Sequence, residues 1–236
     1  MVEKNKYALK DIRFEHIINI LKLSIGDEIE IGILNGSTGI AQIDSISSEQ
    51  LTIKSKYLQP QIEIKPEKTL ICALPRPQTV KKVLITSAMM GIKNIHFIRA
   101  NRVEKSYYHS PLLEPGNIKP YLLEGLSQGK NTQLPTVTIH KRFKPFFEDY
   151  FPSVCDDKTI KLLPDIETDC FLNSFYSCGN NPLALVIGPE GGWVPFEIDL
   201  MKETGFRPYR LSQSVLRVEH ALTAALAQIE LIVNTN

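Results

Sequence analysis

The residues best placed to do chemistry gather in a glycine-rich segment near the C-terminal end. Residues 185–193 read Leu-Val-Ile-Gly-Pro-Glu-Gly-Gly-Trp, so an apolar run ends in a turn with three glycines. Such a turn lets a ligand approach main-chain amides and carbonyls. A phosphate-binding P-loop would continue with Lys and then Ser or Thr, but Trp193 and Val194 follow here, and Glu190 puts a carboxylate in the centre. The turn therefore predicts a ligand read through backbone hydrogen bonds, although such a turn alone is more often a structural connection.

A second segment, Leu211 to Glu219, leads into the last helix and carries the other candidate pair. Arg217 and Glu219 stand at the entrance of that helix, where a carboxylate favours the N-terminal end. One interpretation is a capping carboxylate with an ion pair. The other is that Arg217 faces a substrate.

The elements that must position these segments alternate between strand and helix after residue 66. The predicted strands are Leu70–Leu74, Ile95–Ile98, Val137–Ile139, Thr159–Leu163 and Leu183–Ile187; the predicted helices are Thr79–Met90, Asn117–Gln128, Phe143–Phe151, Pro195–Thr204 and Glu219–Val233. This order predicts an α/β fold with a mostly parallel sheet and helices on both faces. Ligands bind such sheets at the carboxyl ends of the strands, so loops 162–164, 188–194 and 211–217 converge if their strands are neighbours.

The first 66 residues have a different pattern. Short β-branched runs, Glu28–Ile33, Ile40–Ile46 and Leu51–Lys56, predict a small antiparallel barrel or sheet, with a helix over Phe14–Leu21 covering one end. Two prolines among polar residues make Gln59–Pro66 a linker. We therefore predict two domains, residues 1–66 and 67–236.

Composition restricts the function. In 236 residues there is no apolar stretch of membrane-spanning length and no apolar segment of a signal peptide at the start, so we expect a cytoplasmic protein with no membrane partner. The 4 Cys and 5 His lack metal-ligand spacing, so no metal is expected. With 27 Lys and Arg against 26 Asp and Glu, binding to nucleic acid would need a local basic face.

The two segments together resemble a known family. Residues 187–192, followed about twenty residues later by Leu211–Glu219, are similar to the 16S ribosomal RNA uridine-N3 methyltransferases called RsmE, which belong to the SPOUT class. The resemblance covers essentially the whole chain. It includes His16 to Lys22 followed by Gly26-Asp27, Gln128 before Leu134-Pro135, and the strand-end residues Leu162 and Pro164. It implies a PUA-like β-barrel domain followed by a SPOUT-type α/β trefoil-knot methyltransferase domain.

The resemblance also implies a cofactor, a reaction and a second copy. S-adenosylmethionine, which has no phosphate, would be held by Leu162, Pro164, Ile187, Gly188, Glu190, Gly191, Leu211, Ser212, Val215 and Leu216. The substrate would be a specific uridine in 16S rRNA of the small ribosomal subunit. Arg217 and Glu219 are the expected catalytic residues: Arg217 to stabilise charge on the uracil edge, and Glu219 to orient Arg217 or relay the N3 proton. The class also implies a homodimer through the knot region.

Basic residues in both domains are candidates for gripping RNA, with Tyr107 and Tyr108 as stacking partners. The candidates are Arg13, Lys22, Arg76, Arg99, Arg102, Lys105, Lys130, Lys141 and Arg142. A single basic residue is more often a solvated surface charge, so only a cluster is evidence.

The sequence departs from the family pattern at several motif positions. Lys22 replaces an Arg, Val194 replaces a Ser or Thr, Leu211-Ser212-Gln213-Ser214 replaces Leu-Gly-Pro-Arg, and Val218-Glu219-His220 replaces Thr-Glu-Thr. These changes indicate a divergent branch and leave two alternatives open. One is another SPOUT RNA methyltransferase, acting on a different base or on ribose 2′-O, and the other is a non-catalytic RNA-binding protein with this fold.

Overall fold

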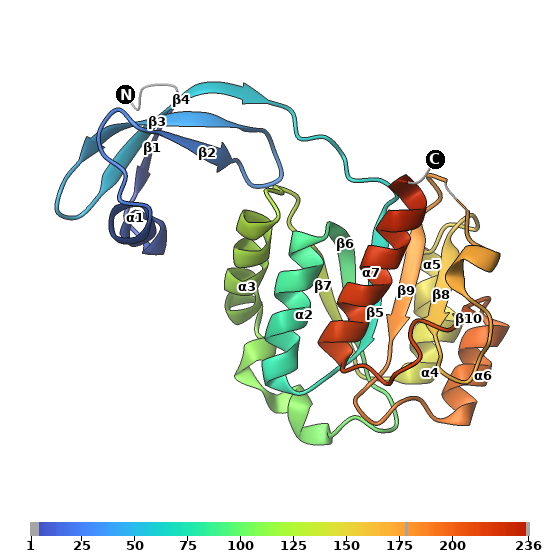
Figure 1. Ribbon diagram of the computed structural model, residues 1–236. Coiled ribbons are helices and arrows are strands. Elements are labelled where there is room, and N and C mark those ends of the chain that lie inside the picture. Colours follow the sequence, from blue (N-terminus) through green and yellow to red (C-terminus); the bar gives the residue numbers. More distant parts are fainter. Residues whose placement is uncertain (1–4, 178, 235–236) are drawn as a thin grey trace. The chain divides into compact units, whose positions relative to one another are not determined.

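The computed structural model describes residues 5–177 and 179–234. The chain divides into two compact units, Met1–Ile62 and Glu63–Asn236 (Figure 1). The division falls inside the expected linker Gln59–Pro66. Among the described residues, no helix is long and apolar enough to cross a membrane.

The N-terminal unit is built on a four-stranded antiparallel sheet in the order β1-β4-β3-β2. Its strands are β1 (Lys6–Leu9), β2 (Glu28–Gly32), β3 (Thr38–Ile46) and β4 (Leu51–Gln59). The short helix α1 (Ile12–Glu15) continues into a π-helical turn, His16–Ile20, from which Ile17 enters the core of the unit. The three predicted strands are confirmed. β1 was missed because its four residues bury only Leu9 and show no alternation.

The C-terminal unit contains a six-stranded sheet in the order β10-β8-β9-β5-β6-β7. The strands are β5 (Lys68–Ala73), β6 (Ile92–Ile98), β7 (Thr136–His140), β8 (Ile160–Pro164), β9 (Leu183–Ile187) and β10 (Arg207–Tyr209), and every pair is parallel. All residues of β9 are buried, as expected for a strand covered on both faces. The α/β fold with a parallel sheet is therefore confirmed.

Helices cover both faces of this sheet (Figure 1). On one face lie α2 (Pro77–Met89), α3 (Pro115–Gln128) and α7 (Val218–Asn234), with short 3-10 turns at Lys105–His109, Pro111–Leu113 and Leu172–Ser174. The other face carries α4 (Phe143–Pro145), α5 (Phe151–Val154) and α6 (Pro195–Glu203). The single helix predicted over Phe143–Phe151 is instead divided by a π-helical turn, Phe146–Tyr150. Prolines at 145 and 152 explain the interruption, since proline has no N–H to donate.

The path after β10 is the least regular part of the fold. The backbone N–H of Arg210 donates to the Cys170 carbonyl at 2.7 Å, and that of Asp165 donates to the Tyr209 carbonyl at 2.9 Å. Residues 209–210 therefore run against the connection between β8 and β9 before the chain returns to place α7 beside α2. β10 was missed because a three-residue strand has no readable period.

The helices α2 and α3 approach each other closely at Gly125. A Cβ there would lie 2.2 Å from the Ile85 carbonyl oxygen and 2.9 Å from the Ala88 Cβ. We expect Gly125→Ala to lower the free energy of unfolding by about 1–3 kcal/mol, because the helices must separate. Urea denaturation measures the change. Gly116→Ala is the matched control in the same helix, since its Cβ would meet nothing within 4 Å; an equal loss in both variants would contradict the prediction.

Two histidines form a polar pair inside the second face of the sheet. His96 Nδ1 lies 3.2 Å from His140 Nε2, and both rings lie against Phe146 and Tyr150. Burial, and to a lesser degree the neighbouring His140, lowers the pKa of His96 to about 4, and burial also lowers the pKa of His140. Both rings are therefore neutral in the folded protein near pH 7.

This pair predicts acid sensitivity. The folded pKa of His96 lies below its ordinary value of 6.5, so its contribution to stability is complete above about pH 6.5 and falls as the pH drops towards 4. Over this pH window the free energy of unfolding falls by about 3 kcal/mol. Denaturation at pH 7.5 and pH 4.5 should show a smaller difference for His96→Phe than for the wild type. His109→Gln, which removes an exposed histidine, should keep the wild-type difference.

Candidate functional site

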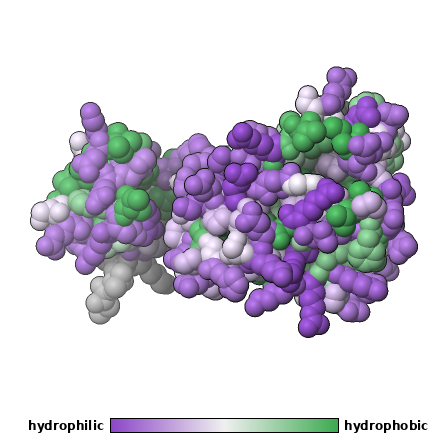
Figure 2. Space-filling model, turned by 90° about the horizontal axis from the view of Figure 1, so that it is seen from below, coloured by the Kyte–Doolittle hydropathy of each residue, from purple (hydrophilic) through white to green (hydrophobic). Residues whose placement is uncertain are grey.

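Five strand ends meet at one edge of the C-terminal unit. Because β10, β8, β9, β5 and β6 are consecutive neighbours and parallel, the segments that follow them leave from the same edge. The predicted convergence of loops 162–164, 188–194 and 211–217 is therefore confirmed, although the third of these follows a strand that was not predicted. Figure 2 views the molecule from this side, where hydrophilic residues cover most of the surface and apolar ones lie between them.

The glycine-rich turn after β9 is shaped by two of its glycines and by Trp193. Gly192 has φ of 72°, a left-handed conformation that favours glycine. A Cβ on Gly188 would lie 3.0 Å from the Trp193 Nε1, so the indole lies directly over that backbone. Trp193 also packs against the cores on both faces of the sheet. It was not among the predicted site residues, and its position beside the glycines was the available signal.

The carboxylate of Glu190 has a basic partner. Glu190 Oε1 accepts hydrogen bonds from the Arg76 Nε at 3.2 Å and from the Arg76 backbone N–H at 3.3 Å. Arg76 stands at the end of β5 as the N-cap of α2. The negative charge that makes the turn unsuitable for phosphate is thus paired with a guanidinium.

Glu197 holds the start of α6, where Val194 occupies the N-cap position. Valine has no side-chain acceptor, so the start of α6 lacks the usual N-cap bond. The Glu197 carboxylate instead accepts from the Val194 N–H at 3.1 Å, and its other oxygen accepts from the Asn101 N–H at 2.7 Å. Glu197 is buried, with 3% of its surface exposed. One carboxylate therefore caps the helix and joins the turn to the segment after β6.

The segment that begins at Leu211 is held at its start by a residue of α7. Gln228 Nε2 donates to the Leu211 carbonyl at 2.9 Å. Ser212 is half-buried and its hydroxyl accepts from the Ser214 N–H, while Val215 is 85% exposed. The Leu216 side chain is half-buried. The segment thus has a fixed beginning and an exposed centre.

Arg217 and Glu219 do not form the expected ion pair. Glu219 Oε1 accepts from the Lys82 Nζ of α2 at 2.9 Å. That hydrogen bond holds the pKa of Glu219 below its usual range, against the opposing effect of burial. The exposed Arg217 guanidinium has no hydrogen bond or ion pair within the described residues. Glu219 therefore contacts Lys82 and not Arg217, because the sheet order brings α2 to the start of α7.

The basic candidates divide by position. Arg76, Arg99, Arg102, Lys105, Lys141 and Arg142 all follow β5, β6 or β7 and lie at the strand-end edge. Lys130 precedes β7 and lies at the opposite edge, away from the converging loops. Arg13 pairs with Asp11 through three side-chain hydrogen bonds, and Lys22 is exposed with φ of 53°; both belong to the N-terminal unit. Six of the nine basic candidates therefore lie at one edge of the sheet of the C-terminal unit.

The predicted cofactor-binding residues include strand-end residues and residues of the glycine-rich turn. Leu162 and Ile187 are buried at the ends of β8 and β9, and Pro164 is half-buried beside them. Gly188, Glu190 and Gly191 follow as the turn.

Among residues 5–177 and 179–234, no group of three or more His, Cys, Asp or Glu is placed to hold a metal ion.

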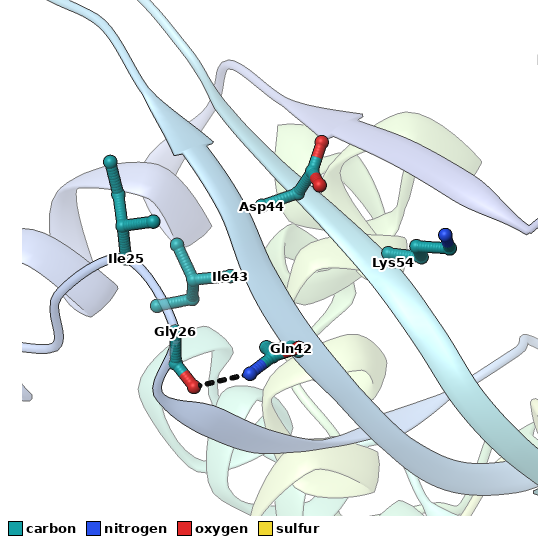
Figure 3. Close-up of a pocket in the computed structure, with 6 residues that line it drawn as sticks. All are labelled: Ile25, Gly26, Gln42, Ile43, Asp44 and Lys54. Carbon is teal, nitrogen blue, oxygen red and sulfur yellow. Dashed lines mark hydrogen bonds between the residues drawn. The ribbon is translucent and has the colours of Figure 1, made fainter.

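The N-terminal unit has a pocket of its own, of about 230 Å³ (Figure 3). It is lined by Ile25, Gly26, Gln42, Ile43, Asp44 and Lys54. Gln42 Nε2 donates to the Gly26 carbonyl at 2.7 Å, and Asp44 pairs with Lys6. Pockets for small molecules are usually larger, about 300–1,000 Å³. The converging loops of the C-terminal unit are the candidate site because they bring the two predicted segments to one edge of the sheet.

The double role of Glu197 gives a stability prediction. In Glu197→Gln one of the two N–H groups faces an amide NH₂ instead of an acceptor at a buried side chain, so we expect the free energy of unfolding to fall by about 1–3 kcal/mol. The matched control is Glu203→Gln, an exposed position in the same helix. Urea denaturation compares them, and identical curves would show that the carboxylate is not needed.

Comparison with known proteins identifies the family and the relatives that this chain resembles. Residues 63–230 match the family described as an RNA methyltransferase domain. A relative named ribosomal RNA small subunit methyltransferase E, from Treponema pallidum, is 29% identical over 222 residues, covering 94% of this chain and 84% of the relative. The relative named ribosomal RNA small subunit methyltransferase E 1, from Borreliella burgdorferi, is 28% identical, covering 94% and 91%. These matches confirm the resemblance to RsmE.

A solved structure has the same fold. The crystal structure of ribosomal RNA small subunit methyltransferase E from Neisseria gonorrhoeae, bound to S-adenosyl methionine, superposes with a TM-score of 0.78 at 18% identity. The match covers 96% of this chain and 91% of that one. The chain therefore belongs to the RNA methyltransferase domain family.

Proposed function

We propose that this protein is an S-adenosylmethionine-dependent methyltransferase that methylates N3 of a specific uridine in 16S rRNA of the small ribosomal subunit. The observation that carries the proposal is the meeting of the glycine-rich turn and the segment 211–217 at one edge of a parallel sheet. The family match and the RsmE-named relatives support the RNA substrate class.

The residues at this edge suit the proposed cofactor. S-adenosylmethionine supplies an activated methyl group on a positively charged sulfur and has no phosphate, which agrees with a turn that lacks a phosphate-binding lysine. The buried Leu162 and Ile187 would wall the adenine, and Gly188, Gly191, Leu211 and Leu216 would offer main-chain groups. We assign Pro164, Glu190, Ser212 and Val215 to the same pocket. The Arg76 partner lets Glu190 remain at this site as part of a neutral pair.

Arg217 is the residue we assign to the uracil. Loss of the N3 proton leaves negative charge on the O2-N3-O4 edge, and a guanidinium aimed there would stabilise it. The Arg217 side chain is exposed and unpaired among the described residues, so it is available for this contact.

Glu219 receives a different role from the one expected from sequence. A good general base has a pKa near the working pH, but the bond from Lys82 holds the pKa of Glu219 low. We therefore assign Glu219 to fixing the start of α7 and do not assign it the N3 proton. Its effect on Arg217 would be through the helix backbone.

RNA would be gripped along the basic edge and by the N-terminal unit. Arg99, Lys105, Lys141 and Arg142 are exposed at the strand ends and would meet the phosphate backbone. Tyr107 and Tyr108 lie in the same loop as Lys105 and would stack with a base. Arg13 and Lys22 would extend the grip in the N-terminal unit, which we propose as the RNA-binding domain.

We also propose a homodimer through the knot region, working in the cytoplasm where small ribosomal subunits are found. The outer face of α7 supports an interface, since Thr223, Ala227 and Leu231 are exposed along one side of a helix whose opposite side packs into the core.

The decisive experiment is nucleoside mass spectrometry of 16S rRNA from a strain lacking this gene. We expect N3-methyluridine to disappear and to return with the wild-type gene. If a different methylated nucleoside disappears, the protein is another SPOUT methyltransferase. If no modification changes and titration calorimetry detects no S-adenosylmethionine binding, the protein is a non-catalytic RNA-binding protein.

Complementation with Arg217→Ala tests the assigned catalytic residue within the same experiment. We expect N3-methyluridine to stay absent, because removing a group that stabilises transition-state charge costs about 100-fold or more in rate. Binding of S-adenosylmethionine should be retained. Full methylation by this variant would remove Arg217 from the mechanism.

A further inference from the structure

Arg102 was grouped with the RNA-gripping residues, but its side chain lies on the glycine-rich turn. The Arg102 guanidinium donates to the Gly191 carbonyl. The aliphatic stem covers the same glycine, since a Cβ on Gly191 would lie 3.3 Å from Arg102 Cβ and 3.2 Å from its Cδ. Arg102 thus contacts the turn through both its polar head and its stem.

The residue before it contacts the helix that follows the turn. The Asn101 N–H donates to Glu197, which also binds the Val194 N–H. Two successive residues after β6 therefore hold the turn and the helix start that follows it. Arg76 holds Glu190 from the end of β5, so the turn is bound from two neighbouring strand ends.

These contacts meet a physical need of the turn. Gly191 has no side chain of its own, and Gly192 adopts φ of 72°. Glycine loses more conformational freedom on ordering than any other residue, so a glycine-rich ligand loop binds weakly unless its surroundings fix it in advance. Arg102 covers this stretch and bonds the carbonyl of Gly191.

We propose that Arg102 is a positioning residue for the cofactor turn, fixing residues 188–192 before the ligand binds, and that it is not one of the RNA-gripping residues. One of its guanidinium nitrogens donates to the turn and its stem covers Gly191, whereas Lys105, three residues further on, is directed to RNA in the proposed function. The inference that this turn binds S-adenosylmethionine rests on that proposed function; the inference that Arg102 orders the turn does not.

The test compares Arg102→Met, which keeps much of the stem but removes the donor, with Arg102→Lys and with the control Lys105→Met. Hydrogen exchange of the amides in 188–194 is measured without any ligand. We expect faster exchange in Arg102→Met, an intermediate rate in Arg102→Lys, and the wild-type rate in Lys105→Met. Calorimetry with S-adenosylmethionine alone should show roughly 3- to 10-fold weaker binding for Arg102→Met.

A measurement of RNA binding distinguishes a positioning role for Arg102 from an RNA-gripping role. Purified 16S rRNA from the deletion strain is titrated at several salt concentrations. Arg102→Met should keep the wild-type salt slope, whereas Lys105→Met should lower it by about 1 because one phosphate contact is lost. Wild-type exchange in Arg102→Met, or a salt slope reduced as in Lys105→Met, would overturn the proposal. Faster exchange in a protein that does not bind S-adenosylmethionine would uphold the positioning role and reject the proposed function.

Discussion

The parallel hydrogen bonding of β9 between β8 and β5 is the interaction on which the site depends. In this register Leu185 lies opposite Leu70 on one side and Leu162 on the other. The strand is buried throughout, and its side chains pack into the cores on both faces of the sheet. Its glycine-rich turn consequently emerges between the ends of its two neighbours, and the contacts of that turn with Arg76 follow from this placement.

The turn combines an open backbone with fixed surroundings. Glycines at 188, 191 and 192 leave main-chain groups unshielded by side chains of their own. The order that glycine lacks comes from outside the turn: the indole of Trp193 over one glycine, and the buried carboxylate of Glu197 at the following helix start. A site of this kind can recognise an uncharged ligand surface by shape and backbone hydrogen bonds, and needs no lysine of its own.

The segment after β10, which forms the other side of the candidate site, is also held by contacts from distant parts of the chain. Arg210 donates to the carbonyls of Ile166 and Thr168 and pairs with Asp169, so it binds the β8–β9 connection across the chain. Gln228 then holds Leu211 from the last helix. The segment carrying Arg217 is thus anchored at its start, and the bond between Lys82 and Glu219 anchors its end.

Local patterns were enough for much of the fold and for the segments that form the candidate site. The apolar run Leu183–Ile187, the glycines after it and the helix start at Pro195 are properties of neighbours along the chain, so the sequence alone determined that a strand ends in an open turn followed by a helix. Which side chains complete the turn was decided only by the tertiary structure. Arg76, Asn101 and Lys82 are more than 90 residues from their partners, and no periodicity links them. Their contacts arise because the order of strands in a parallel sheet, set by burial across the whole unit, brings distant strand ends to one edge.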